Sequence, residues 1–97
     1  MIAEFSVVPI GAGESVSGYV AECLKIVRAS GLKFEFTALD TILEGDYDEV
    51  MDIIGKCHKK VRSMTDRVMT TVRIDDREGA TNEIERKVKS VEEKIER

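Results

Sequence analysis

Four polar side chains lie close together in the segment TALDTILEG, residues 37–45, and could hold a small ligand. They are Thr37, Asp40, Thr41 and Glu44. A carboxylate offsets a positive charge and accepts hydrogen bonds from an amino group, whereas a threonine hydroxyl both donates and accepts. These residue types therefore suit a small polar or cationic ligand. Ordinary turn chemistry accounts for them equally well, with Asp40 as a turn residue and Glu44 as a solvated strand carboxylate.

The sequence supports a catalytic site or a metal site less well than it supports a small-ligand site. His58 lies beside Cys57 and Lys59, and the sequence supplies no nucleophile or orienting acid that can be placed near it in space, so we expect a structural histidine and no catalytic residue. Two cysteines and one histidine do not supply the four ligands of a zinc site, so we expect no metal. Cys23 and Cys57 fall on the apolar stripes of expected helices, which predicts two free thiols packed in the core.

A phosphate site and a polyanion surface are also weakly supported. The turn PIGAG, residues 9–13, lies between an expected strand and an expected helix, but a dinucleotide-binding turn needs a third glycine where Val16 stands. The 15 Lys and Arg residues against 19 Asp and Glu give a net charge of −4, the wrong sign for a nucleic-acid-binding protein. No window is apolar enough for a membrane span, so we expect a cytoplasmic protein without membrane partners.

Hydrophobic spacing predicts the strands and helices that position residues 37–45. Alternating apolar residues predict strands over residues 2–10, 32–38, 41–44 and 67–75. Helical spacing predicts helices over residues 16–30, from 46 to about 62 and after Gly79. Ser15 or Ser17 could cap the first helix, and Asp46 with Glu49 resembles a capping box for the second.

This order of elements predicts the fold. Strand, helix, strand, strand, helix, strand is the α+β ferredoxin-like βαββαβ sandwich, here with an extra C-terminal helix, in a single domain spanning residues 1–97. Right-handed crossovers place the first strand centrally and both long helices on one face of an antiparallel sheet. The open face would display Glu4, Ser6, Val8, Glu35, Thr37, Met69, Thr71, Arg73 and either Ile42 or Leu43. That face is either solvated or covered by a second copy of the chain.

The last helix is a second surface that needs a partner. Ile84, Val88, Val91 and Ile95 repeat at spacings of four, three and four residues, and the remaining positions are almost all charged. So narrow an apolar stripe must pack on a sheet edge, a neighbouring helix or another subunit. A chain of 97 residues is also close to the lower limit of independent stability, so self-association is expected.

Three separated blocks of this sequence resemble the MTH1187/YkoF-type thiamine-binding protein family, formerly listed as uncharacterised. The blocks are EFSVVPIGAGESVSGYV, ALDTILEGD, and DRVMTTVRIDDREG with ERKVKSVEEKI. The resemblance covers nearly the whole chain. It implies a ferredoxin-like fold, association through the sheets into dimers or tetramers, and binding of thiamine or its hydroxymethylpyrimidine part.

The family pattern also implies particular site residues. It places a tyrosine at Tyr19 and the hairpin residues at Thr41 and Glu44, but it has glycine where this chain has Asp40. Aspartate tolerates a positive φ less well than glycine, so this departure either alters the hairpin or adds a carboxylate opposite the cationic thiazolium.

Together these observations predict a non-enzymatic, cytoplasmic homodimer or homotetramer that binds thiamine or hydroxymethylpyrimidine and needs no cofactor. The expected ligand-binding residues are Thr37, Asp40, Thr41 and Glu44, followed by Ser6 and Tyr19. The alternative is a structural or regulatory oligomerisation domain without a thiamine ligand.

Overall fold

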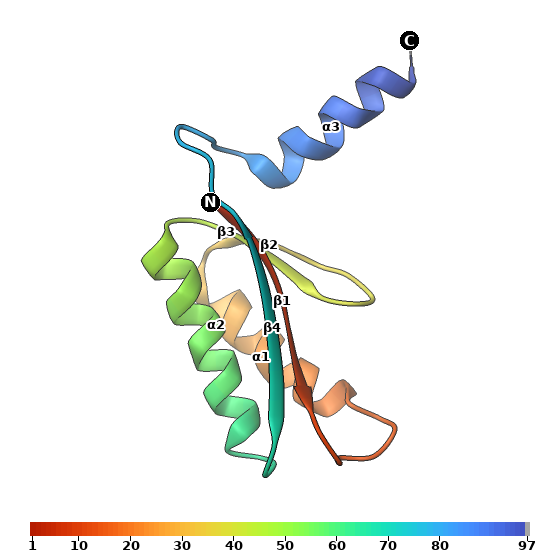
Figure 1. The fold of residues 1–97 in the computed structure, drawn as a ribbon, viewed down its shortest axis with the longest axis vertical. Coiled ribbons are helices and arrows are strands. Elements are labelled where there is room, and N and C mark those ends of the chain that lie inside the picture. Colours follow the sequence, from red (N-terminus) through yellow and green to blue (C-terminus); the bar gives the residue numbers. More distant parts are fainter. Residues whose placement is uncertain (97) are drawn as a thin grey trace.

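The computed structural model describes residues 1–96 and contains four strands and three helices (Figure 1). In chain order they are β1 (Ile2–Pro9), α1 (Ser17–Ser30), β2 (Lys33–Phe36), β3 (Thr41–Glu44), α2 (Tyr47–Arg62), β4 (Val68–Asp75) and α3 (Glu83–Ile95). The order of elements therefore agrees with the prediction.

The strands form one antiparallel sheet in the order β2-β3-β1-β4. The central strand β1 aligns Phe5 with Thr41 of β3 on one side and with Val72 of β4 on the other. This is the predicted ferredoxin-like arrangement with β1 inside the sheet. The register also fixes which residues share a face, because side chains alternate along each strand.

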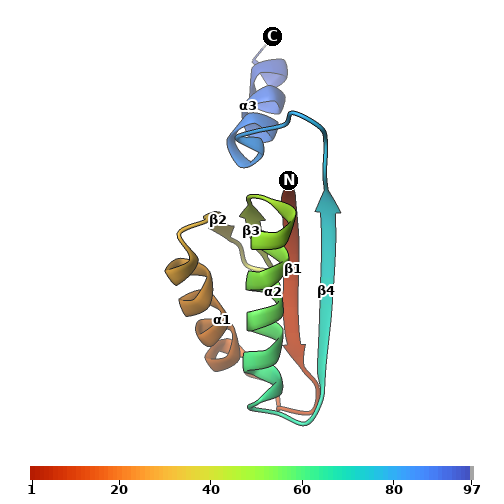
Figure 2. The same ribbon diagram turned by 90° about the vertical axis from the view of Figure 1, so that its left-hand side faces the viewer.

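Both α1 and α2 pack on the same face of the sheet, and no helix within residues 1–96 lies along the other face (Figure 2). On β1, the buried side chains Ala3, Phe5 and Val7 point to the helices, whereas Glu4, Ser6 and Val8 point the other way. The rest of the core comes from Leu43 and from the apolar stripes of the helices, namely Cys23, Val27, Val50, Ile53, Ile54, Cys57 and Val61. The residues on the open face are therefore free to form a site.

Two predicted helix caps differ from the structure. Residue Val16 occupies the N-cap position of α1, and its carbonyl accepts the backbone N–H groups of Tyr19 and Val20, so neither serine caps this helix. Asp46 does stand at the N-cap of α2, but its side chain makes no capping hydrogen bond. The first helix therefore begins one residue later than its apolar periodicity suggested.

The strand predicted over residues 32–38 is also shorter than expected. It ends at Phe36 because the Thr37 hydroxyl accepts the backbone N–H groups of Leu39 at 3.2 Å and Asp40 at 3.1 Å. Local side-chain bonds of this kind compete with the strand ladder. The chain consequently turns at Thr37, and Leu39 projects from the turn with 90% of its surface exposed.

The last helix leaves the body of the molecule. It begins beyond the end of the sheet and extends away from it (Figures 1 and 2). Its contacts with the sheet are made near its N-terminus, where it meets β3. As a result, Val88, Val91 and Ile95 of the predicted apolar stripe are exposed.

Candidate functional site

Two of the predicted site residues, Thr37 and Asp40, form the turn of the β2–β3 hairpin. The backbone N–H of Thr37 donates to the Asp40 carbonyl at 2.9 Å. The Thr37 hydroxyl lies 3.0 Å from Oδ1 of Asp40, to which it can donate. Because backbone and side chain both hold this pair, the Asp40 carboxylate has a defined direction.

The Asp40 carboxyl lies beside Glu4, which projects from β1 on the open face. This proximity raises the pKa of Glu4 above its ordinary value of 4.5, first through the side-chain hydrogen bond with Asp40, then through partial desolvation and through repulsion between the two carboxylates. Two carboxyl groups that share a site in this way resist simultaneous ionisation. A cation placed between them would relieve that repulsion.

Arg73 partly balances the acidic pair. It lies directly opposite Glu4 in the register of β1 and β4, and its Nε approaches Glu4 Oε1 at 2.6 Å. The guanidinium lowers the pKa of Glu4 and so opposes the effect of Asp40. Because the Arg73 side chain is 81% exposed, the ion pair leaves it able to turn toward a ligand.

A cavity of about 370 Å³ lies next to these charges. Its lining combines apolar and charged side chains from β1, β3, β4 and α3: Ile2, Ala3, Glu4, Ile42, Arg73, Ile74, Asp75 and Lys87. Ligand pockets for small molecules typically measure roughly 300–1,000 Å³ and combine an apolar lining with a few polar groups. The cavity therefore suits a small molecule that carries both apolar and charged groups.

The second turn of α3 borders this cavity through Lys87. There Lys87 Nζ lies 2.7 Å from Asp75 Oδ2 at the end of β4, and both residues line the cavity. The side chain of Lys33 on β2 pairs with Glu85 of α3 at 3.0 Å and also donates to Asn82 at 3.1 Å. Ion pairs between strands and helix therefore hold the start of α3 against the sheet.

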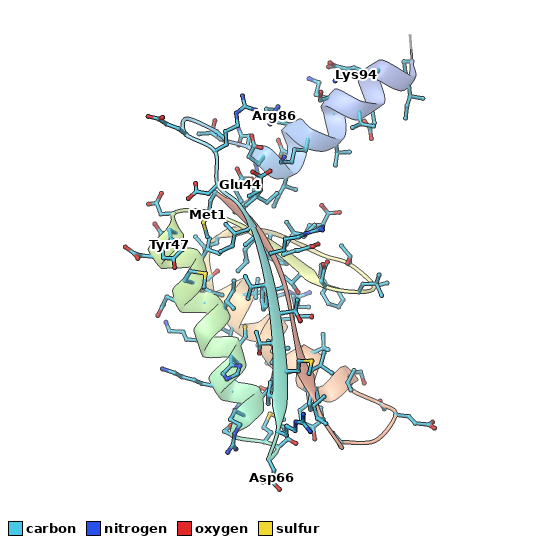
Figure 3. The ribbon with its side chains drawn as sticks, in the orientation of Figure 1. Met1, Glu44, Tyr47, Asp66, Arg86 and Lys94 are labelled. Carbon is cyan, nitrogen blue, oxygen red and sulfur yellow. The ribbon has the colours of Figure 1, made fainter. Side chains whose placement is uncertain are left out.

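Glu44 takes part in the same attachment. Its carboxylate accepts the backbone N–H of Glu83 at 2.7 Å and that of Ile84 at 3.2 Å (Figure 3). The first N–H groups of a helix lack partners within the helix, and a negative charge there is favoured by the helix dipole. Glu44 therefore caps α3 from β3, so its carboxylate is already occupied by protein donors.

The remaining predicted site residues lie on different sides of the sheet. Ser6 is on the open face of β1, opposite Thr71 of β4. Thr41 is buried on the helix-covered side, where it aligns with Phe5, and Tyr19 packs from α1 against the core. The structure thus brings Thr37 and Asp40 together with Glu4 but separates Thr41 and Tyr19 from them.

The sequence did not single out Glu4, Arg73 or the residues of α3 as site residues. Glu4 and Arg73 were expected on the open face, but only the register of β1 and β4 shows that they are directly opposite each other. Lys87 could not be predicted, because the position of α3 depends on the distant contact with Glu44. Opposite charges on one face of two paired strands were the available signal for the first two residues.

Among residues 1–96, no group of three or more His, Cys, Asp and Glu side chains is arranged to hold a metal ion. His58 contacts the protein instead, with its Nδ1 lying 2.6 Å from the Thr70 hydroxyl. No helix in the described part of the chain has both the length and the apolarity to span a membrane.

Comparisons with known sequences identify the family. A family model described as thiamine-binding protein matches residues 3–92. The UPF0045 protein MJ1052 of Methanocaldococcus jannaschii is 40% identical over 93 residues, which cover 96% of this chain and 93% of that protein. A UPF0045 protein of Methanothermobacter thermautotrophicus is 38% identical over 96 residues, which cover 96% and 97% respectively.

Comparisons with solved structures agree. The crystal structure of MJ1052 matches with a TM-score of 0.88, covering 95% of each chain. A proposed thiamine biosynthesis/salvage protein of Thermotoga maritima, TM0486, matches with a TM-score of 0.81 over 93% of this chain and 96% of that one. Its sequence identity is 22%, so this second likeness supports the fold alone. The chain described here belongs to the thiamine-binding protein family.

Proposed function

We propose that this protein binds thiamine, or its hydroxymethylpyrimidine part, in the cavity on the open face of the sheet, without catalysing a reaction on it. The observation that carries the proposal is the pair of carboxyls, Glu4 and Asp40, of which Glu4 lines a cavity of suitable size. Family membership supports the same ligand class.

The chemistry of thiamine matches the cavity in three respects. Its thiazolium ring carries a positive charge, which the paired carboxyls would stabilise. The amino group on its pyrimidine ring is a hydrogen-bond donor that suits a carboxylate acceptor, and a ring nitrogen can accept from Arg73. Ile2 and Ile42 offer apolar contact for the ring faces. Each part of the ligand therefore has a partner of the right type within one surface.

The proposal changes the set of residues expected from the sequence. Asp40 and Thr37 are kept as ligand-binding and turn-holding residues, and Ser6 is kept as a neighbour on the same strand face as Glu4. Glu4 and Arg73 become the main contacts. Glu44 contributes by holding α3 beside the cavity, and Thr41 and Tyr19 support the fold around the site.

A second candidate is a structural or regulatory oligomerisation domain without a thiamine ligand. The exposed side chains Val88, Val91 and Ile95 on α3 favour it, since such apolar residues in a row commonly mark an interaction surface. Oligomerisation itself is compatible with ligand binding, because the residues that line the cavity and the exposed apolar residues of α3 are different. We propose that the protein acts as a homo-oligomer, a dimer or tetramer, in either case.

Isothermal titration calorimetry with thiamine and with hydroxymethylpyrimidine tests the proposal. We expect saturable heat for at least one of them, and a loss of most of the affinity in the Glu4→Gln variant. Absence of heat and of any thermal shift at millimolar ligand would leave oligomerisation as the function.

A further inference from the structure

Two buried thiols have no part in the ligand site described above. Cys23 lies in the middle of α1 and Cys57 in the second half of α2, and both belong to the hydrophobic core. They are the only cysteines in the sequence. The two helices pack against each other on the covered face of the sheet (Figure 2). Each thiol therefore has a single candidate partner within the molecule.

The two cysteines contact each other reciprocally. The Cys23 sulfur lies 3.8 Å from the backbone carbonyl oxygen of Cys57, and the Cys57 sulfur lies 3.6 Å from the backbone carbonyl oxygen of Cys23. A disulfide needs Cα atoms roughly 4.4–6.8 Å apart and side chains that point toward each other. Because each sulfur reaches the partner's backbone, the two helices approach closely here and the side chains have the direction that a disulfide requires.

The two thiols differ in acidity. A hydrogen bond between the two side chains lowers the pKa of Cys23 and raises the pKa of Cys57. Burial and the nearby Glu22 carboxylate act against the change at Cys23 but do not reverse it. The Cys57 thiol thus serves as the donor that stabilises a Cys23 thiolate. Since the thiolate is the nucleophilic form of cysteine, Cys23 is the residue expected to react first.

We propose that Cys23 and Cys57 form a reversible disulfide that joins α1 to α2 when the protein meets hydrogen peroxide. The Cys23 sulfur attacks one peroxide oxygen and the O–O bond breaks, which gives a sulfenic acid on Cys23 and one water. The Cys57 sulfur then attacks the Cys23 sulfur, and the S–O bond breaks as the hydroxyl leaves with the Cys57 proton as a second water. The two thiols lose two electrons and two protons in total, and the peroxide is reduced to water. A thiol reductant reverses the bond by exchange.

Burial decides which reagents can start this reaction. Cys57 is fully buried, whereas Cys23 is 8% exposed. Only Cys23 has to meet the oxidant, because the second step joins two side chains that are already in contact. Hydrogen peroxide is little larger than a water molecule, and the reagents that alkylate thiols are much larger. The pair is therefore open to peroxide while it remains closed to alkylation.

The disulfide acts on the fold and does not depend on which ligand the cavity binds. It closes a loop between residues that are 34 positions apart in the chain. A cross-link of this kind stabilises the folded state by restricting the unfolded chain, provided that it fits the native geometry. The oxidised protein should therefore melt at least about 5 °C above the reduced protein. A melting temperature that does not rise would overturn the claim that the bond fits the native helices.

Intact-mass spectrometry of the folded protein after treatment with millimolar hydrogen peroxide tests the proposal. We expect the wild type to lose two hydrogen atoms, to regain them with dithiothreitol, and to yield a peptide that links Cys23 to Cys57 after proteolysis. The control is the double variant Cys23→Ser/Cys57→Ser, which shows the oxygen that peroxide adds to methionine. Two thiols left intact in the wild type, or a disulfide between two copies as the main product, would overturn the proposal.

Single variants test the separate roles of the two thiols. Cys57→Ser keeps a hydroxyl donor beside Cys23 but cannot form the disulfide, so its Cys23 should accumulate as a sulfenic acid that dimedone traps when the treated protein is denatured. Cys23→Ser should show no oxidation of Cys57. Circular dichroism checks that both variants are folded, and the wild-type mass decides the proposal if either is not. Oxidation of Cys57 in Cys23→Ser, without oxidation of Cys23 in Cys57→Ser, would contradict the assigned order.

Discussion

The carboxylate of Glu44 on β3 accepts the backbone N–H of Glu83, 39 residues later in the chain, at 2.7 Å. This contact begins α3 and fixes the direction in which the helix leaves the sheet. A residue expected to bind ligand is thus used to position the helix that borders the cavity. Glu83 in turn holds the Arg86 guanidinium through two contacts of 2.7 and 2.9 Å, and Arg86 keeps the pKa of Glu83 below its ordinary value.

Removing the Glu44 carboxylate should loosen α3. Loss of a capping side chain costs about 0.5–2 kcal/mol, and here the cost should fall on the local opening of the helix. In Glu44→Ala, the amides of Glu83 and Ile84 should exchange with deuterium several-fold faster than in the wild type. Glu44→Gln keeps one carbonyl acceptor and should show a smaller change. Unchanged exchange in Glu44→Ala would show that the cap does not hold the helix in solution.

Neutralising either carboxyl of the acidic pair should weaken thiamine binding. Glu4→Gln and Asp40→Asn each remove a charge-assisted contact, and we expect the dissociation constant to rise by about ten- to a hundredfold in calorimetry. Glu35→Gln is the matched control, since Glu35 lies on the same face but on the edge strand β2. Equal affinities in all three variants would place the ligand elsewhere.

Thiamine binding and stability should respond to pH in opposite directions through the ionisation of Glu4. The hydrogen bond and repulsion from Asp40 raise the pKa of Glu4 in the folded protein, whereas the unfolded chain keeps the ordinary value of 4.5. The folded state therefore binds the Glu4 proton more tightly than the unfolded chain does. Protonated Glu4 contributes stability fully below the unfolded pKa of 4.5, and this contribution is lost as the pH rises through the folded pKa. A cationic ligand favours the ionised pair, and its affinity should increase over the same interval.

The pH effect can be separated from other titrations by comparison with Glu4→Gln. Melting temperatures with and without thiamine, measured from about pH 4 to about pH 7, give the ligand-induced shift at each pH. This shift should grow with pH in the wild type and stay nearly flat in Glu4→Gln. A parallel rise in both proteins would assign the dependence to another group.

Truncating Leu43 to alanine should destabilise the protein, whereas truncating Leu39 should have little effect on stability. Leu43 is fully buried on β3, so Leu43→Ala should lower the free energy of unfolding by about 2–5 kcal/mol. Leu39 is in the hairpin turn and 90% exposed, so Leu39→Ala should change the free energy of unfolding by less than about 0.5 kcal/mol. Urea unfolding measures both. Similar losses in the two variants would mean that the hairpin turn is packed in solution.

The two thiols should be unreactive in the folded protein. Cys23 and Cys57 are buried, and each sulfur is directed at the other residue's backbone carbonyl, at 3.8 and 3.6 Å. The hydrogen bond with Cys23, together with burial, raises the pKa of the Cys57 thiol, which keeps it in the unreactive protonated form. The same hydrogen bond lowers the pKa of Cys23, so burial is what protects that thiol. A thiol reagent should therefore label both residues only after denaturation. Rapid labelling of either in native buffer would contradict this packing.

Much of the fold could be predicted from hydrophobic spacing because the sheet has one buried face. Alternation in β1 and β4 identified the strands, and the helical stripes of α1 and α2 identified the two covering helices. The end of β2 was not predictable in this way. Alternation continues through Thr37, but its hydroxyl binds the backbone of the next residues and turns the chain.

The site was less predictable because its parts meet through tertiary contacts. The turn residues Thr37 and Asp40 were identified because they are neighbours in the sequence. Glu4 and Arg73 are far apart in the sequence, and only strand pairing places them opposite each other. The capping role of Glu44 left no local signal at all, since its partners begin 39 residues later.

The most direct test of the ligand-binding account is a titration of the isotope-labelled protein with thiamine, followed by amide NMR. The account predicts saturable shift changes centred on Glu4, Ile42 and Arg73, with smaller changes at Lys87 and in the hairpin turn. The amides at the opposite end of β4 and on the exposed side of α2 should stay unchanged. Spectra that do not change at millimolar thiamine, or changes confined to the helix-covered side, would contradict it.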